Sequence, residues 1–330
     1  MKKISRIFIR LPNWIGDVCM SLASLNAVIN TGAKVVICAK PWAENLLAAY
    51  TKNPDVEFLA LSGKWRNDSK NIRTYRKSNP VAHKEVGLLI PDSLTSALTF
   101  KFAGLTSAGY KDDGRSLILR WPVTKINPRP HNVNSWYHLT RIALGHWGFN
   151  CKEQAEQNVS LPFTEEHITE KDVYMSQHGL KSKEFIVIAP TAKGLHHGKS
   201  KVWPEYEKLT QALHHQGHRV IMCPPPNEAA QAKTNATSAE MLPPLALGPF
   251  TALLKEAALV ICNDSGVSHL SAAATAKQIT LIGVSEIEHT GPWSSNALVL
   301  GDVNCWPTLD EVLAAISSLE TDRPNNPNTL

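Results

Sequence analysis

Residues 259–273 read LVICNDSGVSHLSAA, an apolar run that stops at an Asn-Asp-Ser-Gly turn before a run of small residues. The pattern predicts a buried strand that passes through a tight turn into a helix. The first amides of a helix have no partner inside it and carry a partial positive charge, so this junction can hold a phosphate. We therefore expect a nucleotide ligand here. The structural alternative is that Asp264 only caps the helix and His269 packs against the sheet.

A second junction of the same kind opens the chain and favours the ligand-binding interpretation. Residues 4–9 are predicted as a strand, the loop LPNWIG follows at residues 11–16, and a helix is predicted from Asp17. Gly16 lets the backbone turn tightly, and Trp14 places a large aromatic side chain where a cleft is expected. Because the helix dipole favours a charged carboxylate, we expect Asp17 to be ionised at neutral pH and able to accept a proton. The alternative role for Asp17 is an N-cap.

Strand-like and helix-like runs alternate along the whole chain, which predicts parallel sheets with helices on both faces. The 330 residues amount to about twice the usual domain length. The expected fold is α/β, with two Rossmann-like, doubly wound domains that face each other across a cleft. We place them at residues 1–163 and 164–320, followed by a disordered tail at 321–330. Ligands of such sheets bind outside the carboxyl ends of the strands, where both junctions lie.

The individual elements are predicted from their apolar periodicity. Strands are expected at residues 4–9, 34–38, 56–61, 86–90, 185–189, 219–223, 259–262 and 278–282. Helices are expected from residue 17 up to Gly32, at 41–50, from about 92, and at 134–147, 204–216, 227–238, 266–276 and 309–319. The basic, polar stretch 65–84 gives no clear prediction, and residues 120–130, with three prolines, are expected to be irregular.

The loop that follows the strand at 185–189 is strongly basic and reads PTAKGLHHGKSKVWP at residues 190–204. It is one residue short of a P-loop, because Gly194 and Gly198 enclose three residues and not four. The charges are either simply solvated or neutralise a diphosphate at the carboxyl end of the sheet. No G-x-G-x-x-G occurs, which weakens a dehydrogenase interpretation, and neither G-x-S-x-G nor H-E-x-x-H is present. There is no D-x-D, the usual diphosphate anchor of metal-dependent sugar transferases.

Composition limits the remaining possibilities. A hydrophobic fraction of 43% and a charged fraction of 19% are typical of a globular protein, and the net charge of +5 is too small to indicate a nucleic-acid partner. Arg10 interrupts the first apolar stretch, so no signal peptide is expected, and no window reaches the ~18 apolar residues of a membrane span. The six cysteines form no C-x-x-C pair and are expected to be buried free thiols. We therefore expect a cytoplasmic protein with at most peripheral membrane contact.

Three segments, in this order, resemble glycosyltransferase family 9, which contains the ADP-heptose:lipopolysaccharide heptosyltransferases. They are PNWIGD at residues 12–17, KVWP at 201–204, and NDSGVSHLSAA at 263–273 with a distant GPW at 291–293. The resemblance runs from residue 4 to about residue 293. It implies a GT-B fold and an inverting transfer that needs no metal or other cofactor. It also implies a nucleotide-sugar donor, ADP-heptose, on the second domain and a lipid-linked saccharide acceptor on the first.

The resemblance also implies roles for individual residues. Asp17 matches the general base, Lys201 matches the lysine that meets the donor phosphate, and Glu228 lies where an acidic residue approaches the nucleoside. The implied donor-binding residues are Thr191, Lys201, Glu228, Asp264, Ser265, Gly266 and His269, and those on the acceptor side are Asn13, Trp14 and Gly16. Ser265 stands where threonine is common. The GLHHG insertion at residues 194–198 leaves open whether Lys199 or Lys201 reaches the phosphates.

Two other functions share the expected two-domain cleft. A GT-B-shaped nucleotide-sugar epimerase or hydrolase needs no acceptor, and a non-catalytic protein only binds the nucleotide sugar. A transferase with a lipid-linked acceptor is expected to work at the inner face of the inner membrane.

Overall fold

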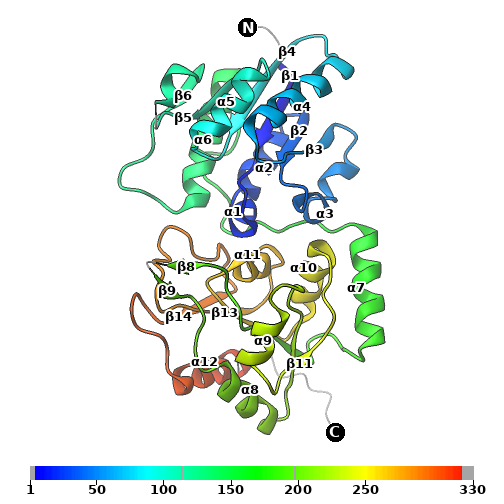
Figure 1. Ribbon diagram of the computed structural model, residues 1–330, viewed down its shortest axis with the longest axis vertical. Coiled ribbons are helices and arrows are strands. Elements are labelled where there is room, and N and C mark those ends of the chain that lie inside the picture. The colour runs from blue at the N-terminus through cyan, green and yellow to red at the C-terminus, as the bar shows by residue number, and fades with distance from the viewer. Residues whose placement is uncertain (1–3, 113, 197, 322–330) are drawn as a thin grey trace.

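Two six-stranded parallel sheets, one in each half of the chain, dominate the computed structural model, which describes residues 4–112, 114–196 and 198–321. The two units are stacked along the long axis, with the first above the second in Figure 1. This is the expected α/β architecture of two doubly wound units.

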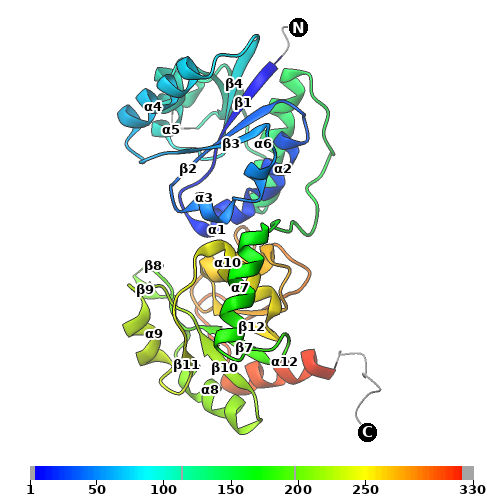
Figure 2. The same cartoon turned by 90° about the vertical axis from the view of Figure 1, so that its right-hand side faces the viewer.

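The first sheet has the strand order β3-β2-β1-β4-β5-β6, so the order reverses between β1 and β4. Its strands are β1 (Ile4–Arg10), β2 (Lys34–Ala39), β3 (Val56–Ala60), β4 (Lys84–Leu89), β5 (Thr106–Tyr110) and β6 (Trp121–Val123). Its helices are α1 (Ile15–Met20), α2 (Leu22–Ile29), α3 (Ala43–Leu46), α4 (Trp65–Ser78), α5 (Leu94–Phe102) and α6 (Asn132–Trp147), with short 3-10 turns at Tyr50–Lys52 and Arg115–Leu117. Figure 2 shows α4 and α5 on one face of the sheet and α2 and α6 on the other.

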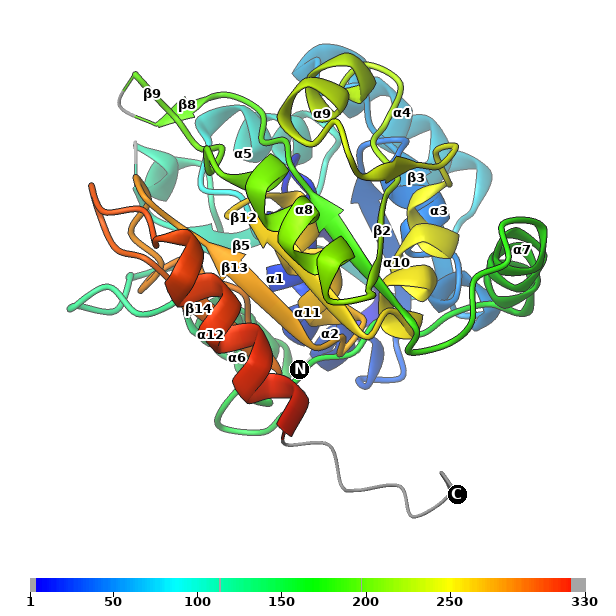
Figure 3. The same cartoon turned by 90° about the horizontal axis from the view of Figure 1, so that it is seen from below.

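The second sheet has the strand order β11-β10-β7-β12-β13-β14 and reverses between β7 and β12. Its strands are β7 (Phe185–Ala189), β10 (Arg219–Met222), β11 (Glu240–Met241), β12 (Leu259–Asn263), β13 (Gln278–Leu281) and β14 (Ala297–Leu300). Its helices are α7 (Glu165–Gln177), α8 (Tyr206–His215), α9 (Ala229–Asn235), α10 (Leu247–Glu256), α11 (Gly266–Ala273) and α12 (Leu309–Thr321). From below, α8 and α12 lie side by side across this sheet (Figure 3).

The basic loop after β7 forms a small antiparallel hairpin. Its strands are β8 (Leu195–His196) and β9 (Lys199–Ser200). The central strands of both sheets are buried on both faces; Ile7, Phe8 and Ile9 in β1 are fully inaccessible to solvent. Each reversal of strand order opens a crevice at the carboxyl end of its sheet, and ligands of doubly wound folds bind in such crevices.

The structure corrects several predicted boundaries. The first helix begins at Ile15 and not at Asp17, and it is interrupted at Ser21, whose hydroxyl donates to the Val18 carbonyl at 2.8 Å. A serine that bonds backward in this way weakens a continuous helix. Residues 65–78, which gave no prediction, form α4, and β6 lies inside the stretch expected to be irregular. The elements β5, α7, α10 and β14 were not predicted. Among the six free cysteines, which were expected to be buried, Cys151 is only partly buried and Cys305 is exposed.

We propose that the two domains join between residues 163 and 164, where the hydroxyl of Thr164 caps α7 and accepts from the His167 amide at 3.1 Å. The final helix includes Thr321, and the rest of the tail predicted at 321–330 lies outside the described residues. Within the described part of the chain, the helices are either too short or too polar to cross a membrane.

Candidate active site

The starts of α1 and α11, one from each sheet, meet where the two units touch. A Cβ atom placed on Gly16 would lie only 2.5 Å from Cδ2 of His269, and one placed on Gly266 would lie 3.3 Å from Cβ of Ile15. Glycine is therefore needed at position 16 for the close approach of the loop to the imidazole ring. The two junctions that the sequence singles out form one seam between the units.

The carboxylate of Asp17 lies on the first turn of α1 beside this seam. It is half-buried, and it forms no hydrogen bond or salt bridge with any residue that the structure describes. Burial raises the pKa of Asp17 from 3.8 to about 6. Desolvation raises this pKa, but the ionised form that the sequence predicts at neutral pH still dominates. At pH 7 about ten carboxylates remain ionised for each one protonated, and a pKa close to neutrality suits a general base.

A hollow of about 480 Å³ opens beside Asp17 at the carboxyl end of the first sheet. Its lining comes from the loop before α1, the loop between β4 and α5, and the segment that leads into α6: Pro12, Asn13, Trp14, Asp17, Ile90, Pro91, Asp92, Ser93, Tyr110, Lys125, Ile126, Arg129, Pro130, Asn132, Ser135 and Trp136. Trp14 is 71% exposed, so its indole ring is free to pack against a ligand. Aromatic and polar side chains of this kind are typical of saccharide-sized ligand pockets.

Sequence reasoning missed several residues around this hollow. The buried guanidinium of Arg10 donates to Oδ1 of Asn13 at 2.6 Å and so fixes the side chain of an expected acceptor residue. Lys125 forms salt bridges with Asp92, at 2.7 Å, and with Asp112. Arg10 could have been found, because an arginine at the end of an apolar strand is costly unless it is paired. Lys125 carries no such local signal.

On the opposite side of the seam, Lys201 and Asp264 form a close ion pair. Nζ of Lys201 lies 2.8 Å from Oδ2 of Asp264, and the Ser285 hydroxyl also donates to this carboxylate. Burial opposes ionisation of Asp264, but Lys201 and Ser285 outweigh it and hold the pKa of Asp264 below its usual value. Burial lowers the pKa of the neighbouring His269 to about 4, so this imidazole is neutral at pH 7. The pair fixes the Lys201 ammonium group next to the start of α11.

The start of α11 has free donors. The N-cap is Ser265 and not Asp264, so the capping alternative for Asp264 is wrong. The Ser265 hydroxyl is buried and makes no hydrogen bond within the described ranges, and the amides of Gly266 and Val267 also have no hydrogen-bond partner there. Together with the nearby Lys201, these donors can bind the oxygens of a phosphate.

Thr191 and Glu228, two further expected donor-site residues, are in direct contact. The Thr191 hydroxyl donates to Oε2 of Glu228 at 2.6 Å, and Lys193 approaches Oε1 at 3.2 Å. The Asn263 side chain donates to the Thr191 carbonyl at 3.3 Å, which connects this cluster to the turn before α11. The structure thus gathers the expected donor residues at the carboxyl edge of the second sheet.

Lys199 lies apart from this cluster. It lies on β9, a strand of the hairpin that was not predicted from the sequence. Its ammonium group is exposed and donates to Oδ1 of Asn304 at 2.6 Å. Of the two lysines left open above, Lys201 is the one that contacts the Asp264 turn.

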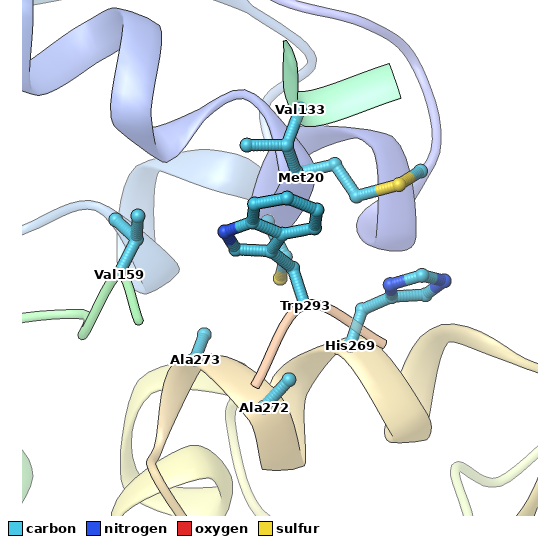
Figure 4. Close-up of a pocket in the computed structure, with 8 residues that line it drawn as sticks. Met20, Val133, Val159, His269, Ala272, Ala273 and Trp293 are labelled. Atoms are coloured by element: carbon cyan, nitrogen blue, oxygen red, sulfur yellow. The ribbon is translucent and has the colours of Figure 1, made fainter. Parts of the chain in front are cut away.

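Trp293, from the GPW segment, crosses from the second unit to the first. Figure 4 shows its ring between Met20 and Val133 of the first unit and His269, Ala272 and Ala273 of α11, around a cavity of about 10 Å³. The indole N–H donates to the Glu156 carbonyl at 2.8 Å.

His131 holds the same segment from the other side. Its ring stacks on Trp293 with centroids 4.7 Å apart. Nδ1 accepts from the Val133 amide at 3.2 Å, so Nε2 carries the proton and donates to the Gly291 carbonyl at 3.0 Å. We call His131, Gly291 and Trp293 the interdomain clasp.

Comparison with known proteins gives a consistent picture. Residues 81–315 match the profile of glycosyltransferase family 9 (heptosyltransferase). Over 311 residues the chain is 24% identical to lipooligosaccharide heptosyltransferase 2 of Haemophilus influenzae, covering 88% of this chain and 86% of the relative.

Solved structures with the same fold cover nearly the whole chain. The ADP-heptose lps heptosyltransferase II of E. coli has a TM-score of 0.73 at 21% identity, over 95% of this chain and 98% of that one. The E. coli heptosyltransferase WaaC with ADP has a TM-score of 0.70 at 20% identity, over 95% and 99% of the two chains. The fold of these heptosyltransferases is the GT-B fold, as the sequence resemblance implied.

Proposed function

The chain belongs to glycosyltransferase family 9 and is a glycosyltransferase, and from this premise we propose that it transfers heptose from ADP-heptose to a lipopolysaccharide core acceptor. The relatives named above carry this activity in their names, and one solved relative holds ADP. One observation supports the proposal most directly. An unpaired carboxylate, Asp17, faces a saccharide-sized hollow and lies within the seam that also contains the phosphate donors of α11.

The acceptor binds in the hollow on the first domain, with Trp14, Asn13 and Gly16 on its inner side. Its hydroxyl oxygen attacks the anomeric carbon of the donor while Asp17 takes the hydroxyl proton. The new carbon–oxygen bond forms as the bond between the anomeric carbon and the diphosphate oxygen breaks, and ADP leaves with that electron pair. A single displacement of this kind inverts the anomeric configuration.

The donor diphosphate binds against the start of α11. Charge on the leaving oxygen grows as the bond breaks, so Lys201 and the amides after Ser265 stabilise the transition state more than the ground state. The neutral His269 lies against Gly16 and holds the two loops in register. Thr191 assists Lys201 at the phosphate, and Glu228 binds the nucleoside side of the donor. In other transferases a divalent metal neutralises the charge on the leaving diphosphate. Here Lys201 and the N–H donors of α11 do so, and the transfer is therefore metal-independent.

The test measures ADP release from ADP-heptose with a heptose-deficient lipopolysaccharide core as acceptor. Asp17→Ala is expected to lower kcat by about 1,000-fold or more, with the Kd for ADP nearly unchanged. Asp310→Ala is the matched control, because Asp310 also lies on the first turn of a helix but far from the seam. Near-normal turnover of Asp17→Ala removes this residue from the chemistry.

Two further measurements address the stereochemistry and the metal. The anomeric configuration of the product is read by NMR and is expected to be opposite to that of the donor. Activity is expected to persist in EDTA, and a loss restored by a divalent cation contradicts the metal-independent mechanism. Conversion of ADP-heptose to an epimer or a free sugar without acceptor favours the epimerase or hydrolase alternative, and binding of the donor without any turnover favours the non-catalytic one.

A further inference from the structure

A row of cations without acidic partners among the described residues follows the outer surface of α4, far from the seam in sequence, and Arg73 among them donates to the Phe102 carbonyl. Arg66, Lys70, Arg73 and Lys77 are all exposed and are spaced by four, three and four residues. This spacing puts them on one side of the helix, and we call them the basic face. Figure 2 shows α4 on the outside of the first sheet, away from α2 and α6.

No carboxylate of α4 offsets the basic face. Asp68, the only acidic residue of the helix, is 3% exposed and accepts from the Ser62 amide and hydroxyl and from the Gly63 amide, at 2.7 to 2.8 Å. Residues 64–77 contain six lysines and arginines and this one buried acid. The net charge of this segment is therefore +5, equal to the formal net charge of the whole chain.

Several exposed lysines elsewhere pair with acids, as in Lys52–Glu166, Lys152–Glu156 and Lys208–Glu205. The four basic-face residues form no salt bridge within the part of the chain that the structure describes. Their charge is therefore available to a negatively charged partner.

An aromatic pair borders the basic face. The rings of Trp65 on α4 and Phe102 on α5 lie 5.3 Å apart, and Phe102 is 50% exposed. The Arg66 guanidinium lies 5.1 Å from the Trp65 ring. Trp65 is partly buried and Phe102 is exposed, and aromatic rings beside lysine and arginine are suited to a bilayer surface, where rings lie at the headgroup level and cations meet lipid phosphates.

We propose that the basic face, with Trp65 and Phe102, docks this protein on the anionic headgroups of a lipid bilayer. The helix α5 begins directly after Asp92 and Ser93, which line the hollow beside Asp17. Docking through α4 and α5 therefore holds the hollow close to the membrane surface, where a lipid-linked acceptor is found. The docking itself depends on the charges and rings of this face and not on the sugar that is transferred.

The test is co-sedimentation of the purified full chain with vesicles that contain no saccharide. The chain is expected to bind vesicles with about 30% phosphatidylglycerol and not pure phosphatidylcholine, and binding is expected to be lost near 1 M salt because the Debye length falls to about 3 Å. Lys70→Glu combined with Lys77→Glu is expected to weaken binding by at least about tenfold. The matched control is Lys34→Glu combined with Lys255→Glu, which changes the net charge by the same amount at two exposed lysines outside the basic face. This control is expected to bind the vesicles within about twofold of the unmodified chain.

A second readout separates docking from catalysis. Transfer to a soluble, delipidated core saccharide is expected to be unchanged in the Lys70→Glu, Lys77→Glu variant, whereas transfer to acceptor embedded in vesicles is expected to fall. Phe102→Ser is expected to weaken vesicle binding without changing its salt dependence. Equal binding to neutral and anionic vesicles overturns the inference. An equal loss of vesicle binding in the two double-lysine variants also overturns it, as does a higher affinity for duplex DNA than for anionic vesicles.

Discussion

The contact between Gly16 and His269 gives the sharpest test of the site geometry. Replacing Gly16 by alanine places a methyl group 2.5 Å from Cδ2 and 3.0 Å from Nε2 of the imidazole, where ordinary contacts begin near 3.4 Å. The ring cannot swing into solvent, because His269 is only 6% exposed. The starts of α1 and α11 must therefore separate by about 1 Å, since ordinary van der Waals contact lies at about 3.4–4 Å.

That displacement has two measurable consequences. Overpacking of a tight contact destabilises by about 1–3 kcal/mol. A shift of about 1 Å between a catalytic base and its substrate lowers turnover by about 100-fold. Gly16→Ala is thus expected to lower kcat by about 100-fold. Its affinity for ADP is expected to fall far less, because the α11 amides and Lys201 are retained.

The assay combines steady-state ADP release with denaturant unfolding. Gly145→Ala is the matched control: Gly145 lies exposed within α6, a Cβ there meets no atom within 4 Å, and alanine is expected to stabilise the helix by up to about 1 kcal/mol. The stability cost of Gly16→Ala is expected to vanish in a His269→Ala background, where no ring opposes the methyl group. A folded Gly16→Ala enzyme with normal kcat, or an undiminished stability cost in that background, refutes the steric reasoning.

Three further predictions follow from the site and the clasp. Because folding raises the pKa of Asp17 from 3.8 to about 6, the native state binds its proton more tightly and the ionised carboxylate is destabilising above pH 6. Asp17→Asn is therefore expected to gain up to about 3 kcal/mol of stability at pH 8 and nothing below pH 4 in urea unfolding, and wild-type kcat/KM is expected to fall as the pH drops below 6. Lys201→Ala is expected to weaken ADP binding by about tenfold or more in calorimetry, and unchanged ADP affinity would assign phosphate binding elsewhere. The variant is also expected to have a lower Tm, because it leaves Asp264 buried without its cation. Adding Asp264→Asn to this variant is expected to restore Tm. Trp293→Ala, which removes the clasp ring, is expected to increase the radius of gyration in X-ray scattering and to lower kcat more than ADP affinity, whereas an unchanged scattering profile contradicts the clasp.

The parts of the fold that sequence predicted best are buried strands with continuous apolar runs. The predicted strands at 185–189 and 259–262 match β7 and β12 to within one residue, because strands buried on both faces are apolar throughout. The helix α4 was missed because its side chains are mostly polar; its start is held instead by Asp68, which bonds back to the preceding turn. The edge strand β14 was missed because it is short and half-exposed.

The candidate site was predicted only where one local segment carries the signal. The turns that contain Asp17 and Asp264 each show a strand, a tight turn and a helix in sequence. The clasp was not predicted, because His131 has no pattern of its own and the GPW segment does not reveal which residue Trp293 contacts. The rise in the Asp17 pKa was not predicted, because a sequence reveals the helix that bears a carboxylate but not the atoms that exclude water from it.

The contact of Gly16 with His269 also bears on how product leaves. A rotation of one domain against the other displaces each atom in proportion to its distance from the axis. When the axis passes through this contact, residues far from it, at the outer edges of the hollow and of the nucleotide pocket, undergo large displacements. The base and the leaving oxygen lie near the axis and scarcely move relative to each other. For the transfer proposed above, such a rotation lets the product nucleotide be exchanged for fresh donor between turnovers without rebuilding the reaction centre each time.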